Sequence, residues 1–106
     1  MRFSLDEKMP DLIIQFACGN ADNRAEEFQH HLINLKIIRA GVQHETQGSE
    51  VWLNFPSIQS DAINRIVREA RPWCLDRGLG LMQNTVESGT SQPVVLMIAD
   101  LTRMVD

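Results

Sequence analysis

The chain has no long apolar segment. Its longest apolar runs, within residues 11–18 and 93–99, are about half the length that a helix needs to cross a bilayer. Residues 1–10 mix charges of both signs and lack the apolar core of a secretory leader. We therefore expect a protein that has no membrane association and that works in the cytoplasm.

Positive charge is also scarce. The chain has 10 Lys and Arg against 14 Asp and Glu, which gives a formal net charge of −4. A protein that binds nucleic acid through its phosphates needs a cationic face. The predicted strands contain Trp52 but almost no Lys or Arg, whereas a sheet that binds RNA needs both exposed aromatic and basic side chains. This composition argues against a nucleic-acid partner.

Cysteine and recognisable catalytic motifs are few. Cys18 and Cys74 lie in apolar contexts at no CxxC spacing, so we expect both to be reduced core residues. His30 and His31 are adjacent and would point about 100° apart on a helix, while His44 lies in a separate predicted strand. The chain has no GxGxxG and no Walker lysine. We therefore expect no metal and no cofactor, assign no catalytic residues and favour a non-enzymatic role. A cleft that held His44 with Glu45, Glu50 or Cys18 would instead indicate an enzyme.

One short segment is well placed to organise the chain. Residues 11–18 are almost wholly apolar and are closed by Gly19 and Asn20. A segment of this length suits a strand that is buried on both faces rather than a helix. The 106 residues suit one domain. We expect a single α+β domain over residues 1–106 with this strand at its centre.

A helix is expected to follow this strand. Asn23 with Glu26 forms a capping pattern, and Asp22 is an alternative cap. Apolar residues then recur at spacings of three and four, namely Ala25, Phe28, Leu32 and Leu35. Gly41 is well placed to end the helix, although the β-branched residues 37–38 could instead begin the next strand.

The middle of the chain predicts a hairpin and a second helix. Residues 42–46 and 50–55 alternate apolar and polar side chains around a turn at 47–49. Ser57 is expected to cap a helix that ends at Gly78. Pro72 removes one backbone hydrogen bond, so we expect a kink or a restart near residue 71.

Two further strands complete the predicted order β-α-β-β-α-β-β. They cover residues 79–86, with a possible bulge at Gly80, and residues 93–99, with a polar loop at 87–92 between them. The first six elements match the split β-α-β arrangement of the ferredoxin-like plait. Right-handed crossovers would place both helices on one face. We therefore expect an antiparallel sheet with two helices on one face.

The opposite face of this sheet is the predicted interface. Alternation places a mostly apolar set of side chains there, namely Ile13, Gln15, Trp52, Asn54, Val95 and Met97. For the last strand the set Val94, Leu96 and Ile98 is the alternative. An exposed apolar face usually marks an interface, and a second copy of the chain is the simplest cover. We expect a regulatory or protein-interaction module that forms a homodimer around Trp52, unless the chain's own termini cover the face.

A small-ligand site is the alternative function. Gly19, Asn20, Asp22 and Asn23 form the turn between the first strand and the first helix, and backbone N–H groups at a helix start can hold an anion. Regulatory amino-acid-binding domains of the ACT-like kind place a ligand at this turn of a plait, and the analogy implies a ligand-sensing domain.

A last candidate surface is a basic ridge on the second predicted helix, which comprises Arg65, Arg68 and Arg71. It could bind an acidic protein partner, unless it is only a solvated helix face.

Overall fold

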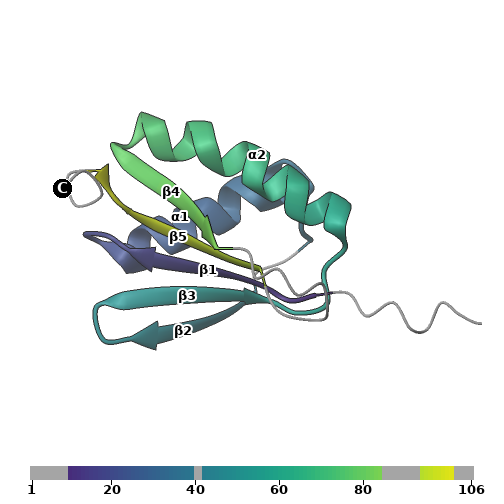
Figure 1. Ribbon diagram of the computed structural model, residues 1–106, viewed down its shortest axis with the longest axis horizontal. Coiled ribbons are helices and arrows are strands. Elements are labelled where there is room, and N and C mark those ends of the chain that lie inside the picture. The colour runs from purple at the N-terminus through teal and green to yellow at the C-terminus, as the bar shows by residue number, and fades with distance from the viewer. Residues whose placement is uncertain (1–9, 40–41, 85–93, 102–106) are drawn as a thin grey trace, which may run out of the picture.

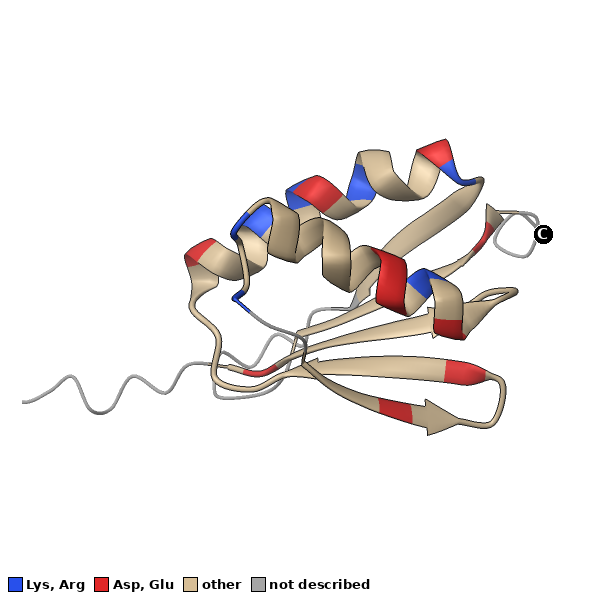
Figure 2. Ribbon diagram, turned by 180° about the vertical axis from the view of Figure 1, so that it is seen from behind, with Lys and Arg blue, Asp and Glu red and all other residues tan. Residues whose placement is uncertain are grey.

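Both helices lie on one face of a five-stranded sheet in the computed structural model, which describes residues 10–39, 42–84 and 94–101 (Figures 1 and 2). The elements, in chain order, are β1 (Leu12–Ala17), α1 (Ala21–Asn34), β2 (Gln43–Gln47), β3 (Glu50–Phe55), α2 (Ser60–Asp76), β4 (Leu79–Asn84) and β5 (Val94–Asp100). The predicted element order and the α+β class are confirmed. Neither described helix is long and apolar enough to cross a membrane.

The strand order is β2-β3-β1-β5-β4, and the sheet is mixed. β1 is central, as predicted, but it pairs antiparallel with β3 and parallel with β5. The predicted all-antiparallel sheet is therefore wrong, and the ferredoxin-like order is not found, because β5 lies between β1 and β4. The reason lies in the composition of β5, which is apolar on both faces. A strand of this kind is better buried inside a sheet than left at its edge.

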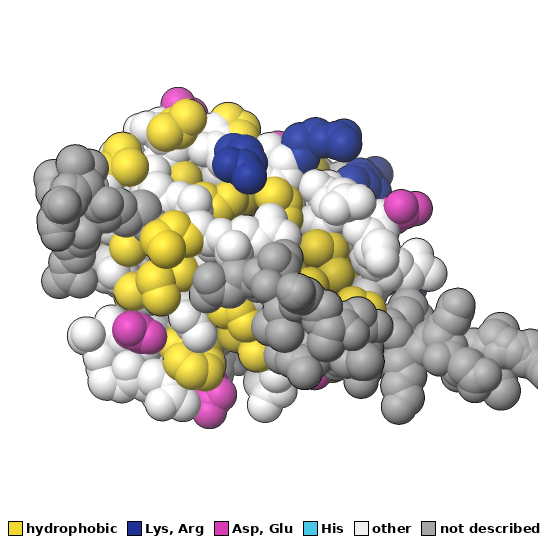
Figure 3. Space-filling model, in the orientation of Figure 1, with side chains coloured by type: hydrophobic (Ala, Val, Ile, Leu, Met, Phe, Trp, Pro, Cys, Tyr) yellow, Lys and Arg dark blue, Asp and Glu magenta, His cyan; other side chains and the backbone are white. Residues whose placement is uncertain are grey.

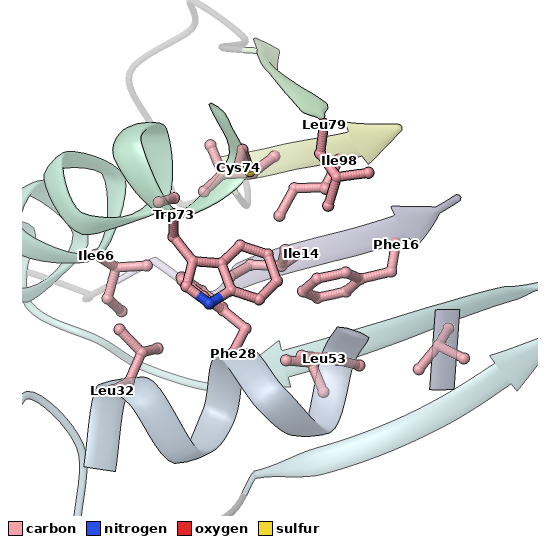
Figure 4. Packing of buried hydrophobic residues seen from close by; sticks show 14 of the residues in the cluster. Ile14, Phe16, Phe28, Leu32, Leu53, Ile66, Trp73, Cys74, Leu79 and Ile98 are labelled. Atoms are coloured by element: carbon pink, nitrogen blue, oxygen red, sulfur yellow. The ribbon is translucent and has the colours of Figure 1, made fainter. Parts of the chain in front are cut away.

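The core lies between the sheet and the two helices. Alternate residues of three strands are buried toward the helices: Leu12, Ile14, Phe16, Val51, Leu53, Phe55, Leu96 and Ile98. The alternation predicted for the first and third strands is thus confirmed, and in β5 the structure decides between the two sets that the sequence left open. Three aromatic rings meet at the centre of this layer (Figure 4). The ring centroid of Phe28 from α1 lies 4.9 Å from that of Trp73 from α2 and 6.2 Å from that of Phe16 from β1. The sheet and both helices thus share one apolar layer.

The start of α1 differs from the prediction. The residue before the helix is Asn20, which adopts a left-handed conformation with φ 58° and makes no side-chain capping bond. Asp22 and Asn23 lie inside the first turn, so neither caps the helix as predicted. Gly19 and Asn20 form a tight turn directly after β1, and the helix therefore begins earlier than the capping pattern indicates.

The end of α1 also differs, and a Schellman motif explains it. Lys36 has φ 61°; its N–H donates to the carbonyl of Ile33 at 2.9 Å, and the N–H of Ile37 donates to that of Leu32 at 3.0 Å. Ile37 then packs against the core. The helix thus ends before Leu35, which is 41% exposed and not in the core as predicted. The predicted end at residue 41 lies outside the described residues.

α2 is one continuous helix. It begins after Gln59 without a side-chain cap. Ser57, the predicted cap, instead donates its N–H to Oδ1 of Asp11 at 2.9 Å. The helix continues through Pro72 to residue 76, so the predicted restart is wrong. Gly78 adopts φ 70° directly after the helix and ends it as predicted.

The remaining strand boundaries lie close to the predictions. β2 begins one residue later than expected, at Gln43, and a two-residue loop with Gly48 at φ 65° joins it to β3. Gly80 pairs with Ala99 in an unbroken register, so the predicted bulge at Gly80 is wrong. β4 is described up to residue 84, and the predicted loop at residues 87–92 lies outside the described part of the chain.

Candidate functional site

The sheet face that the helices leave uncovered brings the predicted interface residues together; we call it the open face. They form two adjacent rows across β3, β1 and β5. The first row is Trp52, Gln15 and Met97, and the second is Asn54, Ile13 and Val95. All six side chains are half-buried. Because Leu96 and Ile98 are buried beneath the helices, β5 turns Val95 and Met97 to the open face rather than the alternative set.

The first row continues to both edges of the sheet. Glu45 of β2 lies beside Trp52, and Met82 of β4 lies beside Met97. Met82 is 47% exposed. Figure 3 looks onto this face and shows hydrophobic side chains gathered across its middle, with acidic side chains at its lower end. The open face is therefore apolar at its centre and toward β4, and acidic toward β2.

Trp52 is held in place by an intrachain hydrogen bond. Its Nε1–H donates to Oε1 of Glu50 at 2.9 Å. Residues 50 and 52 are two apart in β3 and so point to the same face. The indole N–H is thus satisfied within the chain, and the ring remains available for apolar contact. The described strands contain Glu45, Glu50 and Asp100 but no Lys or Arg, so these strands supply no Lys or Arg to the open face.

The predicted ligand turn lines a shallow depression of about 310 Å³. Asn20, Asp22 and Asn23 lie on one side of it, and Glu50 and other residues of the β2–β3 hairpin lie on the other. Gly19, the fourth predicted residue, is not part of the lining. Its N–H donates to Oδ2 of Asp100 at 3.4 Å. The structure thus brings three of the four predicted ligand residues to one cavity.

The charge of this depression does not suit an anion. Its lining contains Asp22 and Glu50 but no Lys or Arg, and an anion there would be repelled. The N–H of Gly19 is already directed at the carboxylate of Asp100. Nε2 of His44 lies 3.9 Å from Oδ1 of Asp22. The lining favours a neutral or cationic ligand.

The predicted basic ridge on α2 is divided between two surfaces. Arg65 and Arg68 line a depression with Ile37. Arg71 lines a different, more apolar groove that lies between α2 and β4 and also contains Leu75 and Leu81. Neither depression contains all three arginines, so a partner bound in one of them would not contact all three. The prediction of one ridge did not allow for the helix geometry, because each step of three residues turns the side chain by about 60° around the helix axis.

Sequence reasoning missed an ion-pair network that joins the two helices. Arg77 donates from Nε and Nη2 to Oε2 of Glu27 at 3.0 and 2.8 Å, and its guanidinium lies 4.3 Å from the ring centroid of Trp73. Arg24 donates to the other carboxylate oxygen at 3.0 Å. The hydrogen bond from Arg77 is the main cause that lowers the pKa of Glu27. Glu27 and Arg77 are 50 residues apart, so no local pattern could indicate the pair.

The histidines are exposed or half-buried, whereas both cysteines are buried. Nε2 of His31 lies 3.5 Å from Oε1 of Glu69, and His30 is exposed. The described ranges contain no group of three or more His, Cys, Asp or Glu side chains that could hold a metal ion. Cys18 and Cys74 are both buried in the core, as predicted, and burial raises the pKa of the Cys74 thiol to about 11.

Comparisons with known proteins add no functional information. No protein-family model, curated protein or solved structure matches the chain. The function must therefore be inferred from the surfaces themselves, namely the open face, the turn between β1 and α1, and the groove beside β4.

Proposed function

We propose that the protein is a small non-enzymatic interaction or regulatory module of the cytoplasm, and that it forms a homodimer through the open face. The observation that supports this proposal is the pair of half-buried, mostly apolar rows of side chains across the three central strands. No helix or strand among the described residues covers them. A sheet face that contacts solvent normally carries polar side chains, whereas this face presents Trp52, Ile13, Val95 and Met97.

The size of the open face is suited to a weak dimer. Five strands spaced by about 4.8 Å and running for about 20 Å give a face of about 500 Å² on each protomer. Two such faces would bury about 1,000 Å², which is near the lower bound for a specific interface. We therefore expect a dissociation constant on the order of micromolar. The burial of so small an area provides little more free energy than the entropic cost of association removes.

The charge on the open face selects one of two symmetric arrangements. A two-fold axis across the strands would place β2 over its own copy and bring the two Glu45 carboxylates together, which is unfavourable. A two-fold axis along β1 would instead place β3 over β5 of the second copy. Trp52 would then lie over Met97 of the other protomer, and Glu45 would lie over Met82 at the rim. Sulfur–aromatic contact favours this second arrangement.

The experiment is Trp52→Glu, with light scattering from low to several hundred micromolar protein. We expect the wild type to change from monomer to dimer in this range and Trp52→Glu to stay a folded monomer. Ser49→Glu is the matched control, because it adds the same charge to the exposed turn of the same hairpin. This control should dimerise like the wild type. Far-UV circular dichroism confirms that each variant is folded.

A wild type that stays monomeric at the highest concentration would contradict the homodimer. Removal of residues 1–9 then tests one of the two alternative covers, the N-terminal segment, and removal of residues 102–106 tests the other. If a shortened chain dimerises and the full chain does not, the open face is covered by the segment that was removed. If all three stay monomeric, the open face is not a homodimer interface.

The depression at the turn supports the second candidate function, a ligand-sensing regulatory domain of the ACT-like kind. Asn20, Asp22 and Asn23 line it together, and its acidic lining favours ligands with a free amine. A thermal-shift screen with amines and amino acids tests this candidate. A stabilisation that Asp22→Ala abolishes would favour the ligand sensor, and equal stabilisation of the wild type and Asp22→Ala would remove the turn as its site.

A further inference from the structure

The two edges of the sheet are built differently. β2 forms one edge, and all five of its side chains are exposed and polar, including His44 and Glu45. Polar and charged side chains of this kind protect an edge from pairing with another chain. β4 forms the other edge, and its sequence LGLMQN contains no charge and no proline. No described strand pairs with the outer side of β4, which is the last strand in the sheet order.

Exposed apolar side chains gather around this second edge. Four large hydrophobic side chains of the described residues are exposed, and three of them lie on or beside β4: Leu75 at 67%, Met82 at 47% and Leu101 at 36%. Leu75 and Leu101 line the groove of about 300 Å³ between α2 and β4, together with Leu81. Figure 3 shows hydrophobic side chains beneath the arginines of α2. A local concentration of exposed apolar side chains marks an interaction site.

One positive side chain stands at this groove. Arg71 is exposed and belongs to the lining, which contains no carboxylate. The carboxylates of Glu69 and Asp76 line a depression on another side of α2, beside His31. A second copy of the chain would bring the same groove and the same Arg71, with no groove carboxylate to pair with it. Charge complementarity therefore favours a partner that supplies its own acidic residue.

We propose that the outer edge of β4 binds an extended acidic segment of another protein as a sixth strand. Main-chain hydrogen bonds to β4 would hold the segment, and alternate side chains would enter the groove, as in other cases of strand addition. An aspartate or glutamate of the segment would pair with Arg71. The groove is lined by none of the six interface residues of the open face, so its test does not depend on the homodimer.

The test uses a phage-displayed library of random short linear peptides, selected on the wild type and counter-selected on Arg71→Glu. We expect the selected peptides to alternate apolar and other residues and to include an acidic residue. Fluorescence anisotropy with the best peptide should show a loss of affinity of about tenfold or more in Arg71→Glu and in Leu75→Ser. Arg65→Glu is the matched control, because it makes the same charge change outside the groove. It should bind like the wild type.

Three outcomes would overturn the proposal. The first is a selection that yields no peptide that prefers the wild type over Arg71→Glu. The second is an equal loss in Arg65→Glu and Arg71→Glu, which would indicate general charge attraction. The third is full binding by the same peptide with a central proline, because proline cannot complete a strand ladder. Backbone amide shifts should appear in β4 and not in β2. Trp52→Glu should leave peptide binding unchanged, which separates this result from that of the homodimer.

Discussion

Replacement of Phe28 by alanine is the sharpest test of the core. Phe28 is fully buried in α1 and lies at the centre of the three-ring cluster. Leu35 lies seven residues further along the same predicted apolar stripe, yet it is 41% exposed, because α1 ends before it. The two residues therefore look equivalent in the sequence but differ in the structure.

The expected loss follows from burial. Phe28→Ala should lower the free energy of unfolding by about 3–5 kcal/mol, since it removes a whole buried ring and leaves a cavity. Phe28→Leu keeps most of the apolar volume but loses the ring contacts to Trp73 and Phe16, so it should cost about 1–2 kcal/mol. Leu35→Ala should cost less than about 0.5 kcal/mol, because it changes an exposed surface position.

The assay is guanidinium denaturation of the wild type and the three variants, followed by far-UV circular dichroism. A domain of this size has a total stability of about 5–15 kcal/mol, so Phe28→Ala could leave too little folded protein to measure. The comparison of Phe28→Leu with Leu35→Ala still ranks the two positions in that case. Equal losses at positions 28 and 35 would refute the helix end at Asn34 and the placement of Phe28 in the core.

Two further predictions concern local features that the sequence did not indicate. Lys36→Gly should raise the free energy of unfolding by about 0.5–1 kcal/mol in the same assay. Glycine relieves the strain of the left-handed φ of 61°, and this gain exceeds the cost of the more flexible unfolded chain. A loss of stability would contradict the Schellman motif at the end of α1. The pKa of Glu27 is lowered, chiefly by Arg77, so the ion pair stabilises the fold above the usual carboxylate range and this contribution is lost as pH falls through the folded pKa. Glu27→Gln should therefore cost about 1 kcal/mol or less at neutral pH, in view of its exposure, and nothing in acid; a cost independent of pH would show that the charge of Glu27 is not involved.

Much of the fold follows from local patterns. Alternation along residues 11–18 and 50–55 indicated which side chains face the helices, and Leu12, Ile14, Leu53 and others are buried as expected. The helix boundaries were less predictable, since they depend on competition between weak signals. At residue 36 the packing of Ile37 on the core offsets the cost of a left-handed lysine, and a capping preference alone would not place a helix end there.

Of the candidate surfaces, one could be predicted from the sequence and one could not. The composition of the open face could be predicted, because side-chain alternation along each strand assigns Ile13, Trp52 and Met97 to one side or the other once the core side is known. The edge at β4 could not be predicted. The expected antiparallel order would not have placed β5 between β1 and β4, and the groove that joins Arg71 to Leu81 depends on which strand is outermost.

The sequence by itself determined the number and type of the elements, the faces of the first and third strands and the scarcity of positive charge on the sheet. These properties depend on residues that are close together in the chain, and short-range geometry is enough to derive them. Only the tertiary structure decided the position of β5, the pairing of Glu27 with Arg77 and the exposure of Leu75 and Leu35. Each of these depends on which distant segments share a surface, because burial and strand pairing are settled by the whole layer rather than by any one segment.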